Sequence, residues 1–463
     1  MSQGSISTGI STIFIFSYGL LKCEMDMGGA QQSSDKVNAD VYRISFIQRR
    51  FVRYYSNAQL AVEDMPQREF AFMFYNRNGM SRHISFTPEA LKKYVVEHVP
   101  AHIYYSSALY QKPDAKTMDE KGWNGADLIF DLDADHIPGS EKMSYAEMLE
   151  KVKEEFKKLV DEFLLGDFGF DENDVKIVFS GGRGYHAHIT KDCVRKLGTQ
   201  ERREIVDYIS GTGLFGETNI EDLREKSLQL LFETTAYSPK KMSTREKEER
   251  EEYKKYKTYK YAFRLPPENA TGWKKRIRDA ILHQLTIWSQ MEREKVLKEL
   301  VQDKKIGAYA NKIYDELFVQ GKVEKIMNTG TLSVFSDERL LTYFIKSVLA
   351  KKMIVLGKGE TDEPVTSDIK RLIRLPNSLH GKTGFVVVEM NRSTLDAFDP
   401  LRDAICPSFS DTPVKVEITK PVKIKLKNEH FALEPGTTEL PEYAAMFMLC
   451  SARANLVHGS NYT

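Results

Sequence analysis

The hydrophobic pattern of the chain alternates between two periods. Short apolar runs bounded by turn residues predict strands, because a buried strand is only four to eight residues long. Such runs occupy 69–75, 128–131, 176–180 and 385–389. Apolar residues spaced along one helical face predict a basic amphipathic helix at 46–55 and a charged helix at 145–163. The mixture predicts an α/β (α+β) fold in which the last three runs form a mixed sheet.

The same pattern divides the chain into regions. The sequence turns mainly helical between about 194 and 356, while period-two alternation at 414–418 and 421–426 predicts strands, followed by a helix near 442–452. The predicted regions are an N-terminal extension (1–42), a core (43–193 with 357–410), a helical insertion (194–356) and a C-terminal unit of strands and helix (411–463). For residues 1–42 we expect either a disordered tail or an extension from an upstream start codon.

The first candidate chemistry is Asp131-Leu132-Asp133, which closes the run at 128–131. Residues two apart on a strand point the same way, so the two carboxylates project together. At about 4 Å and an effective dielectric constant near 20, their repulsion costs about 4 kcal/mol. A divalent cation such as Mg²⁺, which prefers hard oxygen ligands, removes that cost. The alternative is a solvated strand end in which Asp133 caps a turn.

A glycine-rich turn follows the run at 176–180 and reads SGGRGYHAH from Ser180 to His188. Glycines let the backbone turn tightly and approach a ligand closely. Ser180, Arg183 and His186 add a hydroxyl, a planar fork of donors and an imidazole, which together suit phosphate oxygens. Alternation in the following strand puts His186 and His188 on one face, and for His188 we favour a structural role.

A third cluster, at 362–384, is dense in acids and phosphate donors. Lys370, Arg371 and Arg374 fall at helical spacing, and Pro376 would end such a helix. The alternative is a solvated basic face next to a turn. That alternative does not explain why one short stretch holds Asp362, Arg374 and His380 together.

These motifs carry a family resemblance. FDLDAD, SGGRGYHAH and RLIRLPNSLHGKTG occur in this order, with PQREFAF upstream and FDPL downstream. Between about 46 and 403 the chain resembles the catalytic small subunit of the archaeal and eukaryotic type of DNA primase, the archaeal form being closer. The resemblance implies a nucleotidyltransferase that makes short RNA or DNA primers on single-stranded DNA during replication. It also implies nucleoside triphosphates as substrates and a primase large subunit as the partner in a heterodimer.

The resemblance also assigns roles to residues. It implies paired metal ligands at Asp131 and Asp133 and a third catalytic carboxylate at Asp362, with Asp368 as a lower-ranked rival. Three carboxylates of this kind can hold two cations, Mg²⁺ or Mn²⁺. The residues implied in nucleotide binding are Ser180, Arg183, His186, Arg374 and His380. Glu69 and Arg82 match upstream residues implicated in initiation.

The cysteines argue against the zinc knuckle that many members of this family carry. Residues 137–176 contain no cysteine, and the four cysteines show no CxxC spacing: Cys23, Cys193, Cys406 and Cys450. We therefore predict no zinc, and we expect these cysteines to be thiols in a reducing cytoplasm.

Composition limits the possible partners. Lys and Arg total 67 against 66 Asp and Glu, a net charge of +1, so any template groove must be a local basic surface. No apolar run reaches the roughly 20 residues needed to span a membrane. We expect a cytoplasmic, nucleoid-associated protein. The charge run at 240–260, which includes three tyrosines, predicts a solvated helix or a mobile arm, with nucleic-acid stacking as the less favoured interpretation.

Two rival functions are also considered. DLDAD after an apolar strand resembles the nucleophile motif of haloacid-dehalogenase phosphohydrolases, but no later metal motif of that class is found and RLIRLPNSLHG has no role there. A non-catalytic replication scaffold is the other rival, and the presence of all three acids argues against it.

Overall fold

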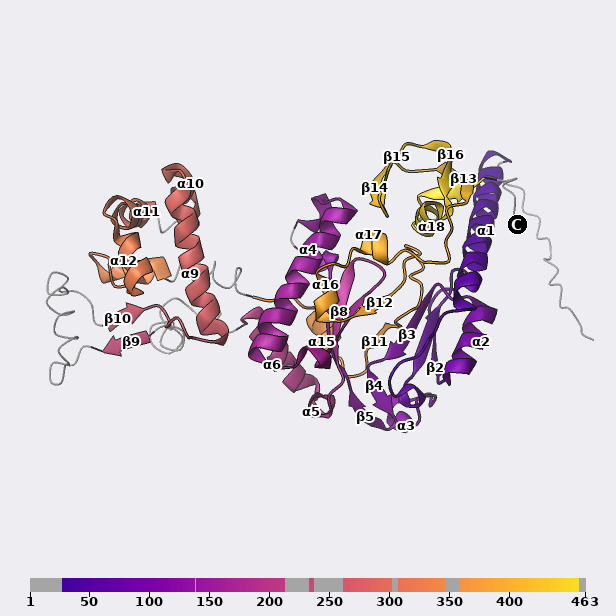
Figure 1. Cartoon of the computed structure of the whole chain (residues 1–463), viewed down its shortest axis with the longest axis horizontal. Coiled ribbons are helices and arrows are strands. Elements are labelled where there is room, and N and C mark those ends of the chain that lie inside the picture. The colour runs from indigo at the N-terminus through magenta and orange to yellow at the C-terminus, as the bar shows by residue number, and fades with distance from the viewer. Residues whose placement is uncertain are drawn as a thin grey trace, which may run out of the picture.

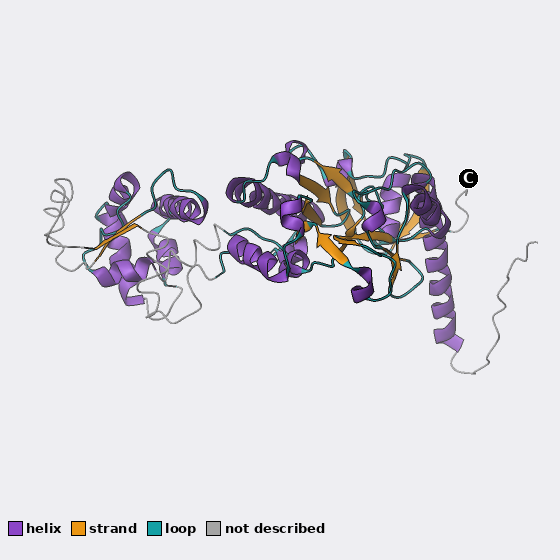
Figure 2. Ribbon diagram, turned by 90° about the horizontal axis from the view of Figure 1, so that it is seen from below, coloured by secondary structure: helices purple, strands orange, loops and turns teal. Residues whose placement is uncertain are grey.

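The computed structural model describes residues 27–137, 139–212, 233–236, 261–301, 307–345 and 358–457. Helices and strands are mixed throughout, as the sequence predicts for an α+β fold (Figures 1 and 2). The described residues contain two large hydrophobic cores. One lies around the sheets, and the other lies within a group of helices at one end of the molecule.

The sheet that carries the acidic strand is antiparallel throughout, so the prediction of a mixed sheet is wrong. Its strands in spatial order are β12 (Val388–Met390), β7 (Val175–Phe179), β8 (Gly184–Ile189) and β6 (Leu128–Asp133). Helix α4 (Tyr145–Lys158) continues into a π-helix (Leu159–Asp167), and both bury apolar side chains in the first core. Ser144 starts α4 with a capping box, because its side chain accepts from the backbone of Glu147 while Glu147 bonds back to Ser144.

A second antiparallel sheet lies beside the first. Its strands in spatial order are β11 (Leu372–Arg374), β3 (His102–Ser106), β1 (Phe70–Met73) and β2 (Met80–Ile84). Helices α1 (Met27–Tyr55) and α2 (Pro88–His98) stand at its side (Figure 1). Strands β4 (Ala108–Tyr110) and β5 (Trp123–Ala126) form a short antiparallel pair, and the connection between them contains α3 (Met118–Lys121).

The helical region holds the second core. Its elements are α9 (Gly272–Gln290), α10 (Arg293–Leu300), α11 (Gly307–Tyr314), α12 (Lys322–Thr329), α13 (Glu338–Tyr343) and a hairpin of β9 (Glu233–Ala236) with β10 (Tyr261–Arg264). Arg276 of α9 joins it to the sheet region, because its guanidinium pairs with Glu162 at 3.0 Å and with Asp167 at 2.6 Å. The charge run at 240–260 lies outside the described residues.

The helices α5 (Asp192–Arg195) and α6 (Thr199–Ser210) belong with the sheets rather than with that group. Helix α6 packs against α15 (Glu363–Ser367), and Val194 and Ile209 are part of the first core. The second core therefore begins well beyond residue 194.

The C-terminal residues form a separate small sheet and a hairpin. The sheet order is β16 (Gly436–Pro441), β13 (Pro413–Ile418) and β17 (Ala454–Leu456), and the hairpin joins β14 (Val422–Leu426) to β15 (Glu429–Leu433). The helices here are α16 (Arg392–Leu395), α17 (Pro400–Asp403) and α18 (Glu442–Cys450). Strands β13 and β14 and helix α18 match the predicted elements, whereas β15, β16 and β17 were not predicted.

Three predicted elements differ from the structure. The basic helix predicted at 46–55 is the end of the longer α1, which crosses the predicted boundary at 42/43, while residues 1–26 lie outside the described residues. The strand predicted at 385–389 is the shorter β12, which begins at Val388. The helical spacing of Lys370, Arg371 and Arg374 is misleading, because α15 ends at Ser367 and residues 372–374 form β11.

Candidate active site

Strand β6 presents Asp131 and Asp133 on one face, as predicted. Both are partly exposed, while Leu132 between them is buried. In the antiparallel register of β6 and β8, Asp131 lies opposite His186 and Asp133 lies opposite Gly184. A Cβ added at Gly184 would lie 2.6 Å from the carbonyl oxygen of Leu132, so only glycine allows β8 to approach the acidic strand this closely.

A cleft of about 730 Å³ opens over this face. Of the residues predicted for catalysis and nucleotide binding, the cleft is lined by Asp131, Asp133, Ser180, Arg183, His186, Arg374 and His380. The structure therefore brings together side chains from three motifs that are far apart in the sequence. The Nε2 atom of His186 lies 3.4 Å from Oδ1 of Asp131.

Asp362 is not among the residues that line the cleft, but its backbone is hydrogen-bonded to the acidic strand. It is the N-cap residue of α15, and its N–H donates a 2.8 Å hydrogen bond to the carbonyl oxygen of Asp131. Its negative charge is among the causes that raise the pKa of Asp131. Asp368 lies at the other end of α15, where its charge acts on Tyr110 and Arg202 instead.

The acids repel one another. Burial, followed by the charges of Asp133 and Asp362, raises the pKa of Asp131 from 3.8 to about 7, while Arg371 and Arg374 act in the opposite direction. As the described side chains stand, no three His, Cys, Asp or Glu groups converge on a point suited to a metal ion. The donor set nevertheless fits a divalent cation, because carboxylate oxygens are hard ligands and a cation removes their mutual repulsion.

The glycine-rich turn is held by its own residues and by the segment around His380. The Ser180 hydroxyl accepts hydrogen bonds from the N–H groups of Gly182 and Gly184, each at 3.3 Å. Gly181 has a φ of +74°, and a Cβ there would lie 2.7 Å from the Cβ of His380. Glycine at this position therefore allows two motifs to pack directly together.

Arg183 stands at the edge of the cleft with an acidic partner. Its Nη2 atom lies 2.5 Å from Oδ2 of Asp135 and 3.7 Å from Oδ1 of Asp133. Asp135 was not singled out in the sequence, although it belongs to the same FDLDAD motif. Both Arg183 and Asp135 are exposed, so a more highly charged anion can replace Asp135 at little cost.

Two side chains that sequence reasoning missed hold Arg374 and His380. Nη1 of Arg374 lies 2.7 Å from Nδ1 of His102 in β3. Nδ1 of His380 lies 3.0 Å from the Thr383 hydroxyl, which donates to the carbonyl oxygen of Gly181 at 2.6 Å. Thr383 could have been noticed inside the RLIRLPNSLHGKTG motif, whereas no sequence signal marks His102.

The histidines around the cleft are neutral. Burial lowers the pKa of His186 and that of His380 well below the usual 6.5, and nearby cations, including Arg374, act in the same direction. Burial and Arg374 lower the pKa of His102 to about 3. These imidazoles can therefore hydrogen-bond a phosphate but add no positive charge to the site.

The predicted initiation residues lie elsewhere. Glu69 is fully buried, and its carboxylate pairs with Nζ of Lys121 at 2.9 Å and with Nε of Arg82 at 3.0 Å. Glu69 and Arg82 thus contact each other as a pair, but neither lines the cleft.

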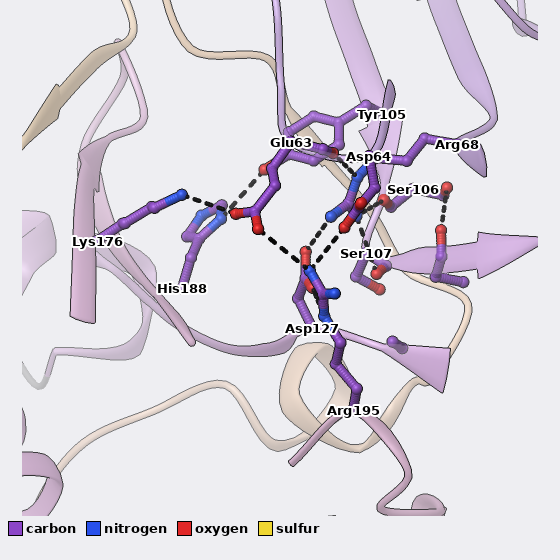
Figure 3. Close-up of polar contacts among 12 residues, drawn as sticks. Glu63, Asp64, Arg68, Tyr105, Ser106, Ser107, Asp127, Lys176, His188 and Arg195 are labelled. Atoms are coloured by element: carbon purple, nitrogen blue, oxygen red, sulfur yellow. Dashed lines mark hydrogen bonds and ion pairs between the residues drawn. The ribbon is translucent and has the colours of Figure 1, made fainter. Parts of the chain in front are cut away.

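A buried ionic cluster supports the start of β6 (Figure 3). Asp127, directly before the strand, pairs with Arg68 at 2.7 Å and with Arg195 at 3.1 Å. The side chains of Arg68 and Asp127 are 1% and 2% exposed, so this pair is almost completely desolvated. Nearby, Nδ1 of His188 lies 3.2 Å from the Tyr105 hydroxyl, which supports the structural role favoured for His188.

The architecture is that of an α+β protein whose antiparallel sheet presents acids to a basic cleft, a combination suited to an enzyme that handles nucleotides. The DNA primase small subunit family model matches residues 130–392. The chain is 41% identical over 418 residues to the DNA primase small subunit PriS of Methanothrix thermoacetophila, covering 89% of this chain and 98% of that protein. The corresponding proteins of Methanocella arvoryzae and Methanosarcina acetivorans are 38% and 39% identical, covering 89% and 90% of this chain and 98% and 97% of their own lengths.

The chain therefore belongs to the DNA primase small subunit family, in its archaeal form. It is a DNA-directed nucleotidyltransferase that synthesises primers in DNA replication, and the phosphohydrolase and scaffold interpretations are set aside. None of the described helices combines the length and apolar character needed to cross a membrane.

Proposed function

We propose that this chain makes short RNA or DNA primers on a single-stranded DNA template by nucleotidyl transfer in the cleft over β6. Asp131, Asp133 and Asp362 would hold the divalent cations, Mg²⁺ or Mn²⁺, of a two-metal site. The observation that supports this most strongly is the arrangement of the cleft, in which partly buried acids face phosphate donors from two other motifs.

When bound, the cations lower the pKa of the attacking 3′-hydroxyl and offset charge on the departing pyrophosphate. The protein supplies position and charge, which is most of what phosphoryl transfer requires. Asp131 is central because its burial and the charges of the other two acids all raise its pKa. The hydrogen bond from Asp362 to the Asp131 carbonyl fixes the start of α15 against β6, so the third acid stays close to the first.

The incoming triphosphate would lie between the glycine-rich turn and the RLIRLPNSLHGKTG segment. Arg183 and Arg374 supply the positive charge, and Arg183 exchanges Asp135 for phosphate oxygens. Ser180, His186 and His380 add uncharged hydrogen bonds. Because His102 and Thr383 hold Arg374 and His380 before any nucleotide arrives, little side-chain freedom is lost on binding.

The wider assembly is proposed from the family. A small subunit implies a larger one, so we propose a heterodimer with the primase large subunit that uses single-stranded DNA and nucleoside triphosphates. We assign initiation to Glu69 and Arg82, and a separate helical unit to the insertion that contains the second core. We also propose a cytoplasmic, nucleoid-associated location and a site without zinc.

One assay tests the proposal. The purified chain is incubated with a single-stranded DNA template, Mg²⁺ or Mn²⁺ and labelled nucleotides, and the products are separated by length. Template-dependent oligomers support the proposal. Phosphate release without oligomers, or no product with either metal, would refute it.

A further inference from the structure

One side of the cleft is lined by residues that belong to none of the three motifs described above. Strand β14 contributes Val422, Lys423 and Ile424, and the turn after α18 contributes Ser451 and Arg453. These residues also lie beyond the segment matched by the family model, which ends at residue 392. The C-terminal unit is therefore part of the cleft, and its role there is unassigned.

Cations on this wall are exposed and unpaired. Lys423 and Arg453 make no ion pair with any residue that the structure describes, and neither does Lys425. Lys425 does not itself line the cleft, but strand alternation puts it on the same exposed face of β14 as Lys423, while Val422, Ile424 and Leu426 are buried. Lys427 at the end of the same hairpin differs, because it pairs with Asp411 at 3.0 Å.

Arg453 lines the cleft, and its backbone is held by two hydrogen bonds. Its N–H donates to the carbonyl oxygen of Met448, and its own carbonyl accepts from the N–H of Thr419, both at 2.9 Å. The charge of Arg453 acts on the phenol of Tyr145, and that phenol donates a 2.6 Å hydrogen bond to the carbonyl oxygen of Gly182. Arg453 is thereby placed near the glycine-rich turn.

Apolar side chains accompany these cations. Met143 and Met148, at the start of the α4 region, line the same cleft as Val422 and Ile424. The cleft thus combines partly exposed apolar surface at Met143 and Met148, on which a base or sugar can rest, with separate positive charges on the wall formed by the C-terminal unit. This combination is typical of surfaces that hold a nucleic-acid strand.

We infer that Lys423, Lys425 and Arg453, here called the C-terminal cationic wall, bind the phosphodiester backbone of the nucleic-acid strand that occupies the cleft beside the incoming nucleotide. The inference rests on the proposed function of the cleft. The donors assigned to the triphosphate include buried side chains such as His186 and His380. Exposed single charges instead suit a backbone that must slide past the site and be released. A net charge of +1 also requires such a surface to be local.

The test measures nucleic-acid binding without catalysis. Binding of the full chain to a fluorescently labelled primer–template is followed by anisotropy in EDTA, without nucleotide, between about 50 and 200 mM salt, the range in which backbone contacts change affinity steeply. Each of Lys423→Ala, Lys425→Ala and Arg453→Ala should lower the affinity by roughly fivefold to tenfold at 0.1 M salt. Each should also reduce the slope of log affinity against log salt by about 1.

Lys420→Ala is the matched control. It removes one exposed lysine from the same C-terminal unit, but Lys420 lies outside β14 and does not line the cleft, so affinity and slope should stay at the wild-type values. Unchanged affinity and slope in the three wall variants would overturn the inference. A raised nucleotide Michaelis constant with normal primer–template binding would also overturn it and would assign the wall to a second triphosphate. Because no chemistry takes place in this assay, its outcome is independent of whether the metal assignment is correct.

Discussion

The backbone N–H of Asp362 donates a 2.8 Å hydrogen bond to the backbone carbonyl oxygen of Asp131. This bond connects the N-cap of α15 to the acidic strand β6, two segments that are far apart in the sequence. It explains how a carboxylate in the third motif comes to act on the first, raising the pKa of Asp131 together with burial and Asp133. The predicted catalytic acids are therefore linked by backbone structure before any cation binds.

The repulsion among these acids predicts that the stability of the metal-free protein depends on pH. The pKa of Asp131 is raised from 3.8 to about 7, so between these pH values the folded chain holds a proton that the unfolded chain has released. The free energy of unfolding of the metal-free protein must then fall as pH rises through this range. Asp131→Asn removes the charge and should stabilise the metal-free chain at pH 8, by at most roughly 4 kcal/mol.

Urea denaturation in EDTA at pH 5 and pH 8 measures this effect. The advantage of Asp131→Asn over wild type should be larger at pH 8 than at pH 5. A variant that is less stable than wild type by the same amount at both pH values would show that the carboxylate carries no electrostatic strain.

The phosphate donors predict a separation between nucleotide use and template binding. Charge-assisted contacts to phosphate contribute about 1.5–3 kcal/mol each. Arg183→Ala or Arg374→Ala should therefore reduce kcat/KM for the nucleotide by roughly tenfold to a hundredfold. Arg402→Ala is a suitable control, because Arg402 is an exposed arginine paired with Asp403 and does not line the cleft.

Template affinity without nucleotide should change little in both variants. If template binding collapses while the nucleotide Michaelis constant stays the same, these arginines form a template groove, as in the alternative interpretation of a basic face.

The buried ionic cluster before β6 predicts that neutralising one carboxylate will greatly lower the free energy of unfolding. Arg68 and Asp127 are almost fully buried, so Asp127→Asn leaves an uncompensated guanidinium in the core (Figure 3). Breaking such a pair should cost about 3–5 kcal/mol of unfolding free energy. Glu63→Gln is the control, because the Glu63–Lys176 pair is exposed and should be worth less than about 1 kcal/mol. Equal losses in the two variants, measured by urea denaturation, would show that burial does not set the cost of breaking these ion pairs.

The cysteines predict a protein without structural zinc. Cys406 and Cys450 are buried, and burial raises the pKa of each thiol to about 12, which disfavours the thiolate that zinc requires. Metal analysis of the purified chain should therefore find no stoichiometric zinc. EDTA should stop primer synthesis while circular dichroism shows an unchanged fold. One tightly held zinc per chain would contradict the prediction.

The local pattern of the sequence was enough to place much of the site. Period-two alternation correctly put Asp131 and Asp133 on one face, and the apolar run predicted at 176–180 is the strand β7, Val175–Phe179, which leads into the glycine-rich turn. Both features depend on neighbouring residues, and a strand in a buried sheet restricts which face each side chain can occupy.

Features that depend on distant pairing could not be predicted in this way. Arg374 fell at helical spacing, but its segment joins a sheet because Arg374 pairs with Tyr104 of β3. The same pairing brings His102 against Arg374, and nothing in the local sequence marks His102 as part of the site. Lys423 belongs to the cleft only because β14, which is distant in sequence from the three motifs, lines the same cleft.

We propose that Asp131, Asp133 and Asp362 form the metal-binding centre of the primase. The most direct test compares template-dependent nucleotide incorporation by Asp362→Asn and Asp368→Asn, with Asp131→Asn and Asp133→Asn alongside and folding checked by circular dichroism. We expect incorporation by Asp131→Asn, Asp133→Asn and Asp362→Asn to fall to background in folded protein, while Asp368→Asn retains most of its activity. Near-wild-type incorporation by Asp131→Asn or Asp133→Asn, or a greater loss in Asp368→Asn than in Asp362→Asn, would contradict the assignment.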